Sequence, residues 1–252
     1  MIELDNLYQG TPFREPLVRS GFTKQSGEAQ NIMTLANNPE IVIRIGKIEF
    51  HKIGDPIYNV HIENRDILNR LRNLYGIAIP EFDLIIGAID EDHVFYTVTE
   101  RIHGHTLRDK VYDQQEIQSA KSKLEIFYSS LVQYFRDVFK NGGWYISDLV
   151  HAANWSGNAQ YVFGRTCRDP EDKIYFVDLG PCLEWHDVDN EDLWLFDFHL
   201  PRLLEMIKET EEKLGSKLQK ARQTFNTFLN SIPEVHQHCL SVVSLKRKLE
   251  SE

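Results

Sequence analysis

The pattern of apolar residues changes near residue 104, and this change limits the folds open to the chain more than any other feature. Before it, the β-branched run EIVIRIGKIEF at 40–50 predicts a strand. The segment at 82–102, FDLIIGAIDEDHVFYTVTERI, predicts two strands around an acidic turn. After it, residues 112–140 carry apolar side chains at helical spacing. We therefore expect an α+β chain, with a β part followed by a mainly helical part.

Shorter segments complete this pattern. In the β part, residues 16–35 alternate weakly around two glycines and predict a hairpin, and a helix is expected at about 59–75, closed by Gly76. In the helical part, NAQYVFGRTCRDPEDKIYFVDLG at 158–180 predicts two short strands around a polar turn. The rest of the chain is expected to be mostly helical, including the charged pattern at 203–230, whose charges either face solvent or bind a partner.

The composition excludes several classes of partner. The chain has 252 residues, of which 38 are acidic and 28 basic, so its formal net charge is −10. Binding to nucleic acid or to an anionic membrane surface needs an excess of Lys and Arg, so we expect neither partner. The three cysteines show no metal-binding spacing, the N-terminus lacks an apolar signal segment, and the longest apolar stretch is too short to span a bilayer. These features indicate a cytoplasmic protein.

The stretch GGWYISDLVHAANW at 142–155 is a candidate site for chemistry. A strand-like run ends at Asp148, and Asn154 follows six positions later. A carboxylate placed there can orient a hydroxyl group, and an amide oxygen can help to hold a metal ion. Alternatively, Asp148 caps a helix and Asn154 lies in an ordinary turn. The pattern alone leaves both interpretations open.

A second candidate follows in KIYFVDLG at 173–180, where four strand-forming residues end at Asp178. Gly180 allows a sharp turn, and the carboxylate is the kind of oxygen ligand that Mg²⁺ prefers. A strand that ends in Asp-x-Gly is also common as a plain turn. This motif gains weight because it lies downstream of Asp148, after a predicted hairpin.

Four motifs together resemble the protein-kinase-like superfamily, and within it the aminoglycoside and choline phosphotransferase branch. The interval from Gly143 to Asp148 matches the glycine and catalytic aspartate of that family. In the family pattern H-R-D-L-x-x-x-N, this chain has Ile146 and Ser147 in place of His and Arg. Asn154 is shifted by one position, which implies a loop with one extra residue.

The run EIVIRIGK resembles the family strand V-A-I-K, with Arg44 in place of the lysine. A guanidinium can also hold phosphate oxygens, so the charge is kept. The resemblance implies a carboxylate partner on the following helix, for which Glu63 is the first candidate and Asp66 the second. VFYTVTERIHGHTL resembles the hinge, so the carbonyl of Glu100 and the amide of Ile102 are expected to face an adenine. Gly104 is expected to let the chain turn into the helical part.

The segment RSGFTKQSGEAQN takes the place of the loop that covers the phosphates. It offers only Gly21 and Gly27, whereas the protein kinases have G-x-G-x-x-G. Two glycines in a polar hairpin are also compatible with ordinary turns.

The resemblance implies a two-lobe α+β fold, with a nucleotide-covering β lobe at 1–103 and a helical lobe at 104–252. In the β lobe, IVIRIG is expected to pair with FYTVTE in one sheet. It implies an ATP- and Mg²⁺-dependent phosphotransferase that acts on a hydroxyl of a small molecule. Asp148 would orient that hydroxyl, Asn154 and Asp178 would hold Mg²⁺, and Arg44 would bind the phosphates. The acidic run EWHDVDNEDLW would suit a cationic substrate.

Two alternatives use the same residues. The departures from the family pattern suit a pseudokinase that acts as a scaffold or regulatory module, with a protein partner bound through its C-terminal helices. Transfer of a nucleotidyl group instead of a phosphoryl group is the other alternative.

Overall fold

A computed structural model of the chain describes residues 17–19, 32–47, 57–89, 92–150, 157–180, 183–188, 195–232 and 240–250. Three of the predicted site residues, Gly21, Gly27 and Asn154, lie outside these ranges.

An antiparallel sheet of five strands forms the β part. Its strands, in spatial order, are β1 (Leu17–Arg19), β2 (Ile32–Leu35), β3 (Asn38–Lys47), β5 (Asp92–Glu100) and β4 (Phe82–Ile89). Strand β3 pairs with β5 from Ile41 opposite Glu100 to Lys47 opposite Val94. The predicted pairing of IVIRIG with FYTVTE in one sheet is therefore confirmed.

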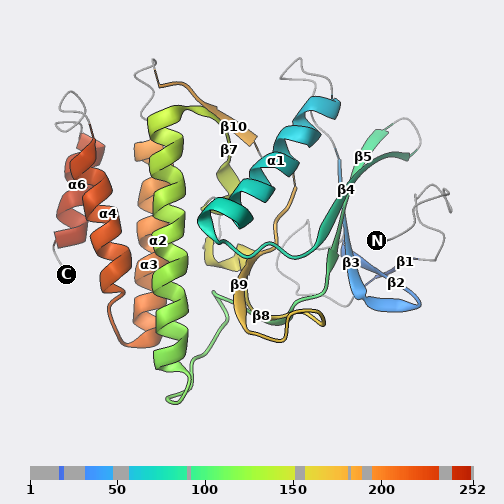
Figure 1. Cartoon of the computed structure of the whole chain (residues 1–252), viewed down its shortest axis with the longest axis horizontal. Coiled ribbons are helices and arrows are strands. Elements are labelled where there is room, and N and C mark those ends of the chain that lie inside the picture. The colour runs from blue at the N-terminus through green and yellow to red at the C-terminus, as the bar shows by residue number, and fades with distance from the viewer. Residues whose placement is uncertain are drawn as a thin grey trace.

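Helix α1 (Ile57–Tyr75) follows the third strand and confirms the helix predicted at 59–75. Its buried side chains recur three and four positions apart: Asn64, Ile67, Leu68 and Leu71 are at most 2% exposed. In Figure 1, α1 crosses between the five-stranded sheet and the long helix α2 (Ile117–Asn141). This spacing makes position 64, and not position 63, the inward-facing residue of α1.

Helix α2 is the centre of the main core. It buries Leu124, Tyr128, Leu131 and Phe135 completely, and it packs against α1 and against two helices of the C-terminal part, at 200–214 and 219–231. Figure 1 shows the C-terminal helices on the side of α2 that is away from the sheet: α3 (Leu200–Leu214), α4 (Gln219–Ser231) and α6 (Leu240–Glu250). Within the described ranges, no helix is long and apolar enough to cross a membrane.

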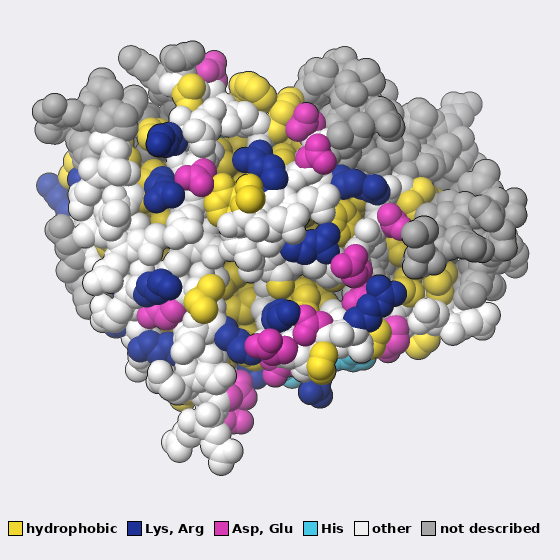
Figure 2. All heavy atoms as spheres, viewed as in Figure 1, with side chains coloured by type: hydrophobic (Ala, Val, Ile, Leu, Met, Phe, Trp, Pro, Cys, Tyr) yellow, Lys and Arg dark blue, Asp and Glu magenta, His cyan; other side chains and the backbone are white. Residues whose placement is uncertain are grey.

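The helical structure predicted for 203–230 is confirmed, and two helices occupy this range. Gly215 adopts a left-handed conformation with φ of 60°, and its N–H caps the end of α3 by bonding to the carbonyls of Glu211 and Glu212. Both helices bury one apolar face. On the face in Figure 2, acidic and basic side chains are interspersed over the described part of the surface.

Two smaller sheets are formed by strands that follow the five-stranded sheet in the sequence. The first, of three strands, contains β6 (His103–Thr106), β8 (Tyr161–Arg165) and β9 (Lys173–Phe176). The second pairs β7 (Gly143–Ile146) with β10 (Leu183–His186). The α+β class, with a small antiparallel sheet, one helix and a mainly helical remainder, is confirmed. The division into lobes at 103/104 stays a prediction.

Gly104 lies inside β6, directly opposite Gly164 of β8. A Cβ atom on Gly104 would approach the carbonyl oxygen of Phe163 to 2.1 Å, and one on Gly164 would approach that of His103 to 2.4 Å. The two glycines therefore let the strands come close together. We expected Gly104 to turn the chain into the helical part, and its role in the structure is close packing instead.

A nearly buried ion pair holds the C-terminal helices together. The guanidinium of Arg222 on α4 donates to both carboxylate oxygens of Glu211 on α3, at 2.7 and 2.5 Å. The two side chains are only 11% and 6% exposed. Glu211 also accepts a hydrogen bond from the backbone N–H of Leu218 in the connection between the helices.

We expect Glu211→Gln to lower the free energy of unfolding by about 3 kcal/mol, because it leaves a buried guanidinium without its counter-charge. Urea unfolding of the variant measures this loss. The control is Glu205→Gln on the same helix, where the pair with Arg202 is exposed and the expected loss is below about 1 kcal/mol. Equal losses in the two variants would contradict this role of the Glu211–Arg222 pair.

Candidate functional site

Arg44 of the five-stranded sheet contacts Asp178, which follows the three-stranded sheet. Strand β3 carries Arg44, and Asp178 follows the end of β9. The Nη1 atom of Arg44 lies 2.5 Å from Oδ1 of Asp178 and 3.4 Å from the carbonyl oxygen of Val177. The two side chains are 29% and 21% exposed, so water screens this ion pair less than a surface pair. The structure thus brings together two residues predicted from separate motifs.

Helix α1 contributes Asn64 to the same segment. Its amide nitrogen donates to the carbonyl oxygen of Leu179 at 3.1 Å, and Asn64 is completely buried. The predicted ion pair between Arg44 and Glu63 is not formed, because Glu63 lies on the exposed side of α1. Asp66, the second candidate, is exposed as well.

Asp148 lies in a short 3₁₀ turn, Ser147–Leu149, directly after β7. Its side chain is partly exposed, whereas Ser147 and Leu149 on either side are buried. In the β7–β10 pair, Ile146 stands opposite Leu183. Since β7 ends two residues before Asp148 and β10 begins five residues after Asp178, this pairing connects the chain segments that carry the two aspartates.

Buried tyrosine hydroxyls fix the backbone on both sides of Asp148. The hydroxyl of Tyr134 accepts a hydrogen bond from the N–H of Ile146 at 3.1 Å. The hydroxyl of Tyr161 donates to the carbonyl oxygen of Leu149 at 2.8 Å. Burial raises the pKa of both tyrosines, so they stay protonated. The position of Asp148 is therefore set by the core on either side of it.

A third buried tyrosine holds Asn158, which follows Asp148 in the sequence. The hydroxyl of Tyr128 on α2 donates to Oδ1 of Asn158 at 2.7 Å and lies 2.6 Å from the hydroxyl of Thr210 on α3. The amide nitrogen of Asn158 donates to the carbonyl oxygen of Met206 and to the carboxylate of Glu209. Asn158 is thus occupied by the core, which argues for a structural role.

Glu184 on β10 forms a second polar cluster beside Asp148. Its Oε2 accepts a hydrogen bond from the hydroxyl of Tyr145 at 2.7 Å and lies 3.1 Å from Nε2 of the buried His199. Ser147 also donates to this carboxylate. Burial alone would raise the pKa of Glu184, but the hydrogen bonds from its three partners outweigh burial and lower that pKa to about 2.

A backbone hydrogen bond and an ion pair hold the predicted hinge, residues 100–102. The backbone N–H of Arg101 donates to the carbonyl oxygen of Glu40 at 2.7 Å. The side chain of Glu100 is buried, and its Oε1 lies 2.6 Å from Nε of Arg168 at the tip of the β8–β9 hairpin. Ile102 is half-buried. Contact of Glu100 and Ile102 with an adenine stays a prediction.

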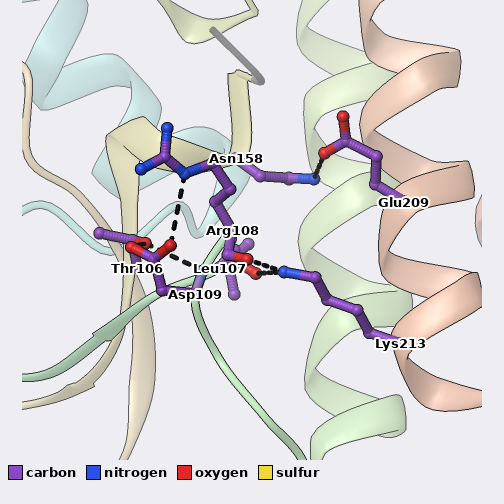
Figure 3. Close-up of polar contacts among 7 residues, drawn as sticks. All are labelled: Thr106, Leu107, Arg108, Asp109, Asn158, Glu209 and Lys213. Atoms are coloured by element: carbon purple, nitrogen blue, oxygen red, sulfur yellow. Dashed lines mark hydrogen bonds and ion pairs between the residues drawn. The ribbon is translucent and has the colours of Figure 1, made fainter. Parts of the chain in front are cut away.

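Helix α3 holds the segment that follows the hinge (Figure 3). Lys213 donates to the carbonyl oxygens of Leu107, at 3.0 Å, and Arg108. The hydroxyl of Thr106 donates to the carboxylate of Asp109 at 2.7 Å and closes a tight turn there. Burial lowers the pKa of Lys213. Lys213 thus anchors the chain between the hinge and α2.

The fit of a magnesium ion depends on Asp178. Among the described residues, no three His, Cys, Asp or Glu side chains gather closely enough to hold a metal ion. Other described residues contact Asp178 at Oδ1 and not at Oδ2, so Oδ2 is a suitable ligand for a hard cation. Next to it, Oδ1 of Asn64 is a buried acceptor without a hydrogen-bond partner. The segment can therefore take a further cationic or hydrogen-bonding group.

Comparison with known proteins shows a distant structural likeness and no match in sequence. No family model matches the chain, and no curated protein matches it. A solved structure described as the microcompartment-associated aminopropanol kinase is similar with a TM-score of 0.44 and 14% sequence identity, over 96% of this chain and 84% of that chain. A likeness this distant bears on neither the activity nor the ligands of this chain.

We expect Glu184→Gln to reduce stability at neutral pH but not in acid. The pKa of Glu184 is about 2 in the folded protein and 4.5 ordinarily, so its ionised form stabilises the fold above about pH 4.5. This stabilisation is lost as the pH falls towards 2. The carboxylate is 36% exposed, and after a discount for solvent screening we expect a loss of about 1 kcal/mol at pH 7.

Urea unfolding of both proteins at several pH values measures this difference. The gap between wild type and Glu184→Gln should narrow as the pH falls below about 4.5. A gap that stays constant down to about pH 2 would show that the ionised carboxylate is not the stabilising form.

Proposed function

We propose that this chain is a nucleotide-dependent phosphotransferase of the protein-kinase-like type, acting on a hydroxyl of a small molecule. The observation that carries the proposal is the contact of 2.5 Å between Arg44 and Asp178. These residues belong to different motifs that both predict a part of one phosphate site, and they lie 134 positions apart in the sequence. The order of strands and helices around them supports the same class of fold.

In this proposal, Arg44 binds phosphate oxygens through its guanidinium, which offers several donors in one plane. Asp148 accepts a hydrogen bond from the substrate hydroxyl and orients it towards the phosphoryl group. The backbone at Glu100 and Ile102 binds the adenine, and the segment with Gly21 and Gly27 covers the phosphates.

Mg²⁺ would be held by Asp178 and Asn154 and would offset the charge of the phosphates. Glu63 is not part of this proposal, because its side chain is exposed on α1. The acidic run EWHDVDNEDLW supports a substrate that carries a cationic group. Part of this run lies outside the described residues.

A pseudokinase is the second candidate, and the same ion pair favours it. An arginine in direct contact with Asp178 offsets the negative charge that a metal ion would need. In that case the chain would bind a protein partner through its C-terminal helices. Their apolar faces are buried in the core, so such a partner would contact their polar faces.

Thermal melting gives the first test. A ligand that binds the folded protein raises its melting temperature by mass action. We expect ATP with Mg²⁺ to raise the midpoint by several degrees, and inorganic phosphate at the same concentration to have a smaller effect. The absence of any shift with ATP, in Mg²⁺ or in EDTA, would contradict both nucleotide binding and the proposed reaction.

Two conservative variants separate the proposed roles. Asp178→Asn keeps the size of the side chain and should abolish the part of nucleotide binding that depends on Mg²⁺. Asp148→Asn should leave nucleotide binding nearly intact, because this carboxylate acts on the acceptor hydroxyl. Calorimetric titration with ATP in Mg²⁺ and in EDTA measures both effects.

Once an acceptor is found, turnover should fall by orders of magnitude in both variants. A pseudokinase would show no phosphate transfer in the wild type, and both variants would keep its partner complex. Dependence of ATP binding on Mg²⁺ that survives in Asp178→Asn would show that another residue holds the metal.

A further inference from the structure

We infer that Asp178 is a positioning residue for Arg44. In the unliganded protein the two side chains hold each other, and a nucleotide and a divalent cation bind cooperatively by separating them. This inference rests on the proposed function, since it assigns the phosphates to Arg44 and the cation to Asp178. It adds a property that the sequence motifs do not contain, namely a competition between two parts of the same site.

The geometry of the ion pair supports this inference. Only Nη1 of Arg44 contacts the Val177–Asp178 segment among the described residues, and it contacts only Oδ1 of the carboxylate. Within the described ranges, the remaining donors of the guanidinium and the other carboxylate oxygen have no hydrogen-bond partner and can bind ligands. Both side chains are partly exposed, so small ions and phosphate groups can approach them.

Helix α1 explains why Arg44 pairs with Asp178. The inward-facing residue of α1 is the neutral Asn64, which donates to the carbonyl oxygen of Leu179. The carboxylates of Glu63 and Asp66 face solvent. Because α1 offers no inward-facing carboxylate at this segment, the carboxylate that Arg44 reaches is the one proposed to bind the cation.

This arrangement couples the two ligands. When phosphates draw Arg44 away, Asp178 is left ionised beside other negative charges, which weakens metal-free binding. A cation at Asp178 removes this penalty and releases Arg44. By reciprocity, the nucleotide must strengthen cation binding by the same factor.

A double-mutant cycle tests the coupling. ATP affinity in EDTA is measured by calorimetric titration for wild type, Asp178→Asn, Arg44→Gln and the double variant. Removing the charge of Asp178 should release Arg44 and tighten metal-free ATP binding by about tenfold. In the Arg44→Gln background the same change should tighten binding by no more than about twofold, because only general repulsion is relieved.

Direct binding of Mn²⁺ without nucleotide, followed by electron paramagnetic resonance, is the second measurement. It keeps the inference testable if Asp178→Asn fails to fold. Arg44→Gln should bind Mn²⁺ more tightly than wild type, because Asp178 has lost its partner. The matched control is the exposed pair of Arg65 and Asp83, in which Arg65→Gln should change neither Mn²⁺ nor ATP binding.

The outcomes separate the two proposals. Equal tightening by Asp178→Asn in both Arg44 backgrounds, or Mn²⁺ binding unchanged by Arg44→Gln, would overturn the inference while leaving nucleotide binding in place. Failure of every variant and of the wild type to bind ATP, with or without Mg²⁺, would overturn the proposed function itself.

Discussion

The burial of tyrosine hydroxyls around helix α2 is the constraint on which the candidate site depends. Tyr128, Tyr134 and Tyr161 are completely or almost completely buried, and a buried hydroxyl without a partner is costly. Their partners are the backbone of Ile146 and Leu149, on either side of Asp148, and the side chain of Asn158. The packing that stabilises the core thus also fixes the backbone on either side of Asp148, on which the proposed chemistry depends.

Electrostatics then define the rest of the site. Arg44 and Asp178 form one cluster, at the end of β9, and Glu184 with its three partners forms another, beside Asp148. Both clusters lie on the chain that runs from β9 through β10. The two aspartates therefore differ: Asp178 is directly paired with a guanidinium, whereas Asp148 is placed by hydrogen bonds made by its neighbours.

Local patterns predicted most elements but few of the contacts between them. The spacing of apolar residues repeats along a strand or a helix, so the type of element can be predicted from it. The break between α3 and α4 depends on one residue, Gly215, inside a charged run. Helical spacing could have identified Asn64 in place of Glu63. The contact of Arg168 with Glu100 has no local signal, because it joins a hairpin tip to a segment 68 positions earlier.

The departures from the kinase pattern coincide with new local partners. Ser147 stands where the pattern has arginine, and it donates to Glu184; Arg44 stands where the pattern has lysine, and it contacts Asp178. A buried polar group without a partner lowers stability, and a site that has lost its function would be expected to contain such groups. Ser147 and Arg44 both have partners, although other buried atoms of the described residues, such as Oδ1 of Asn64 and the hydroxyl of Tyr112, have no hydrogen-bond partner. The surrounding chain thus supplies a polar partner at both substituted positions in the unliganded protein.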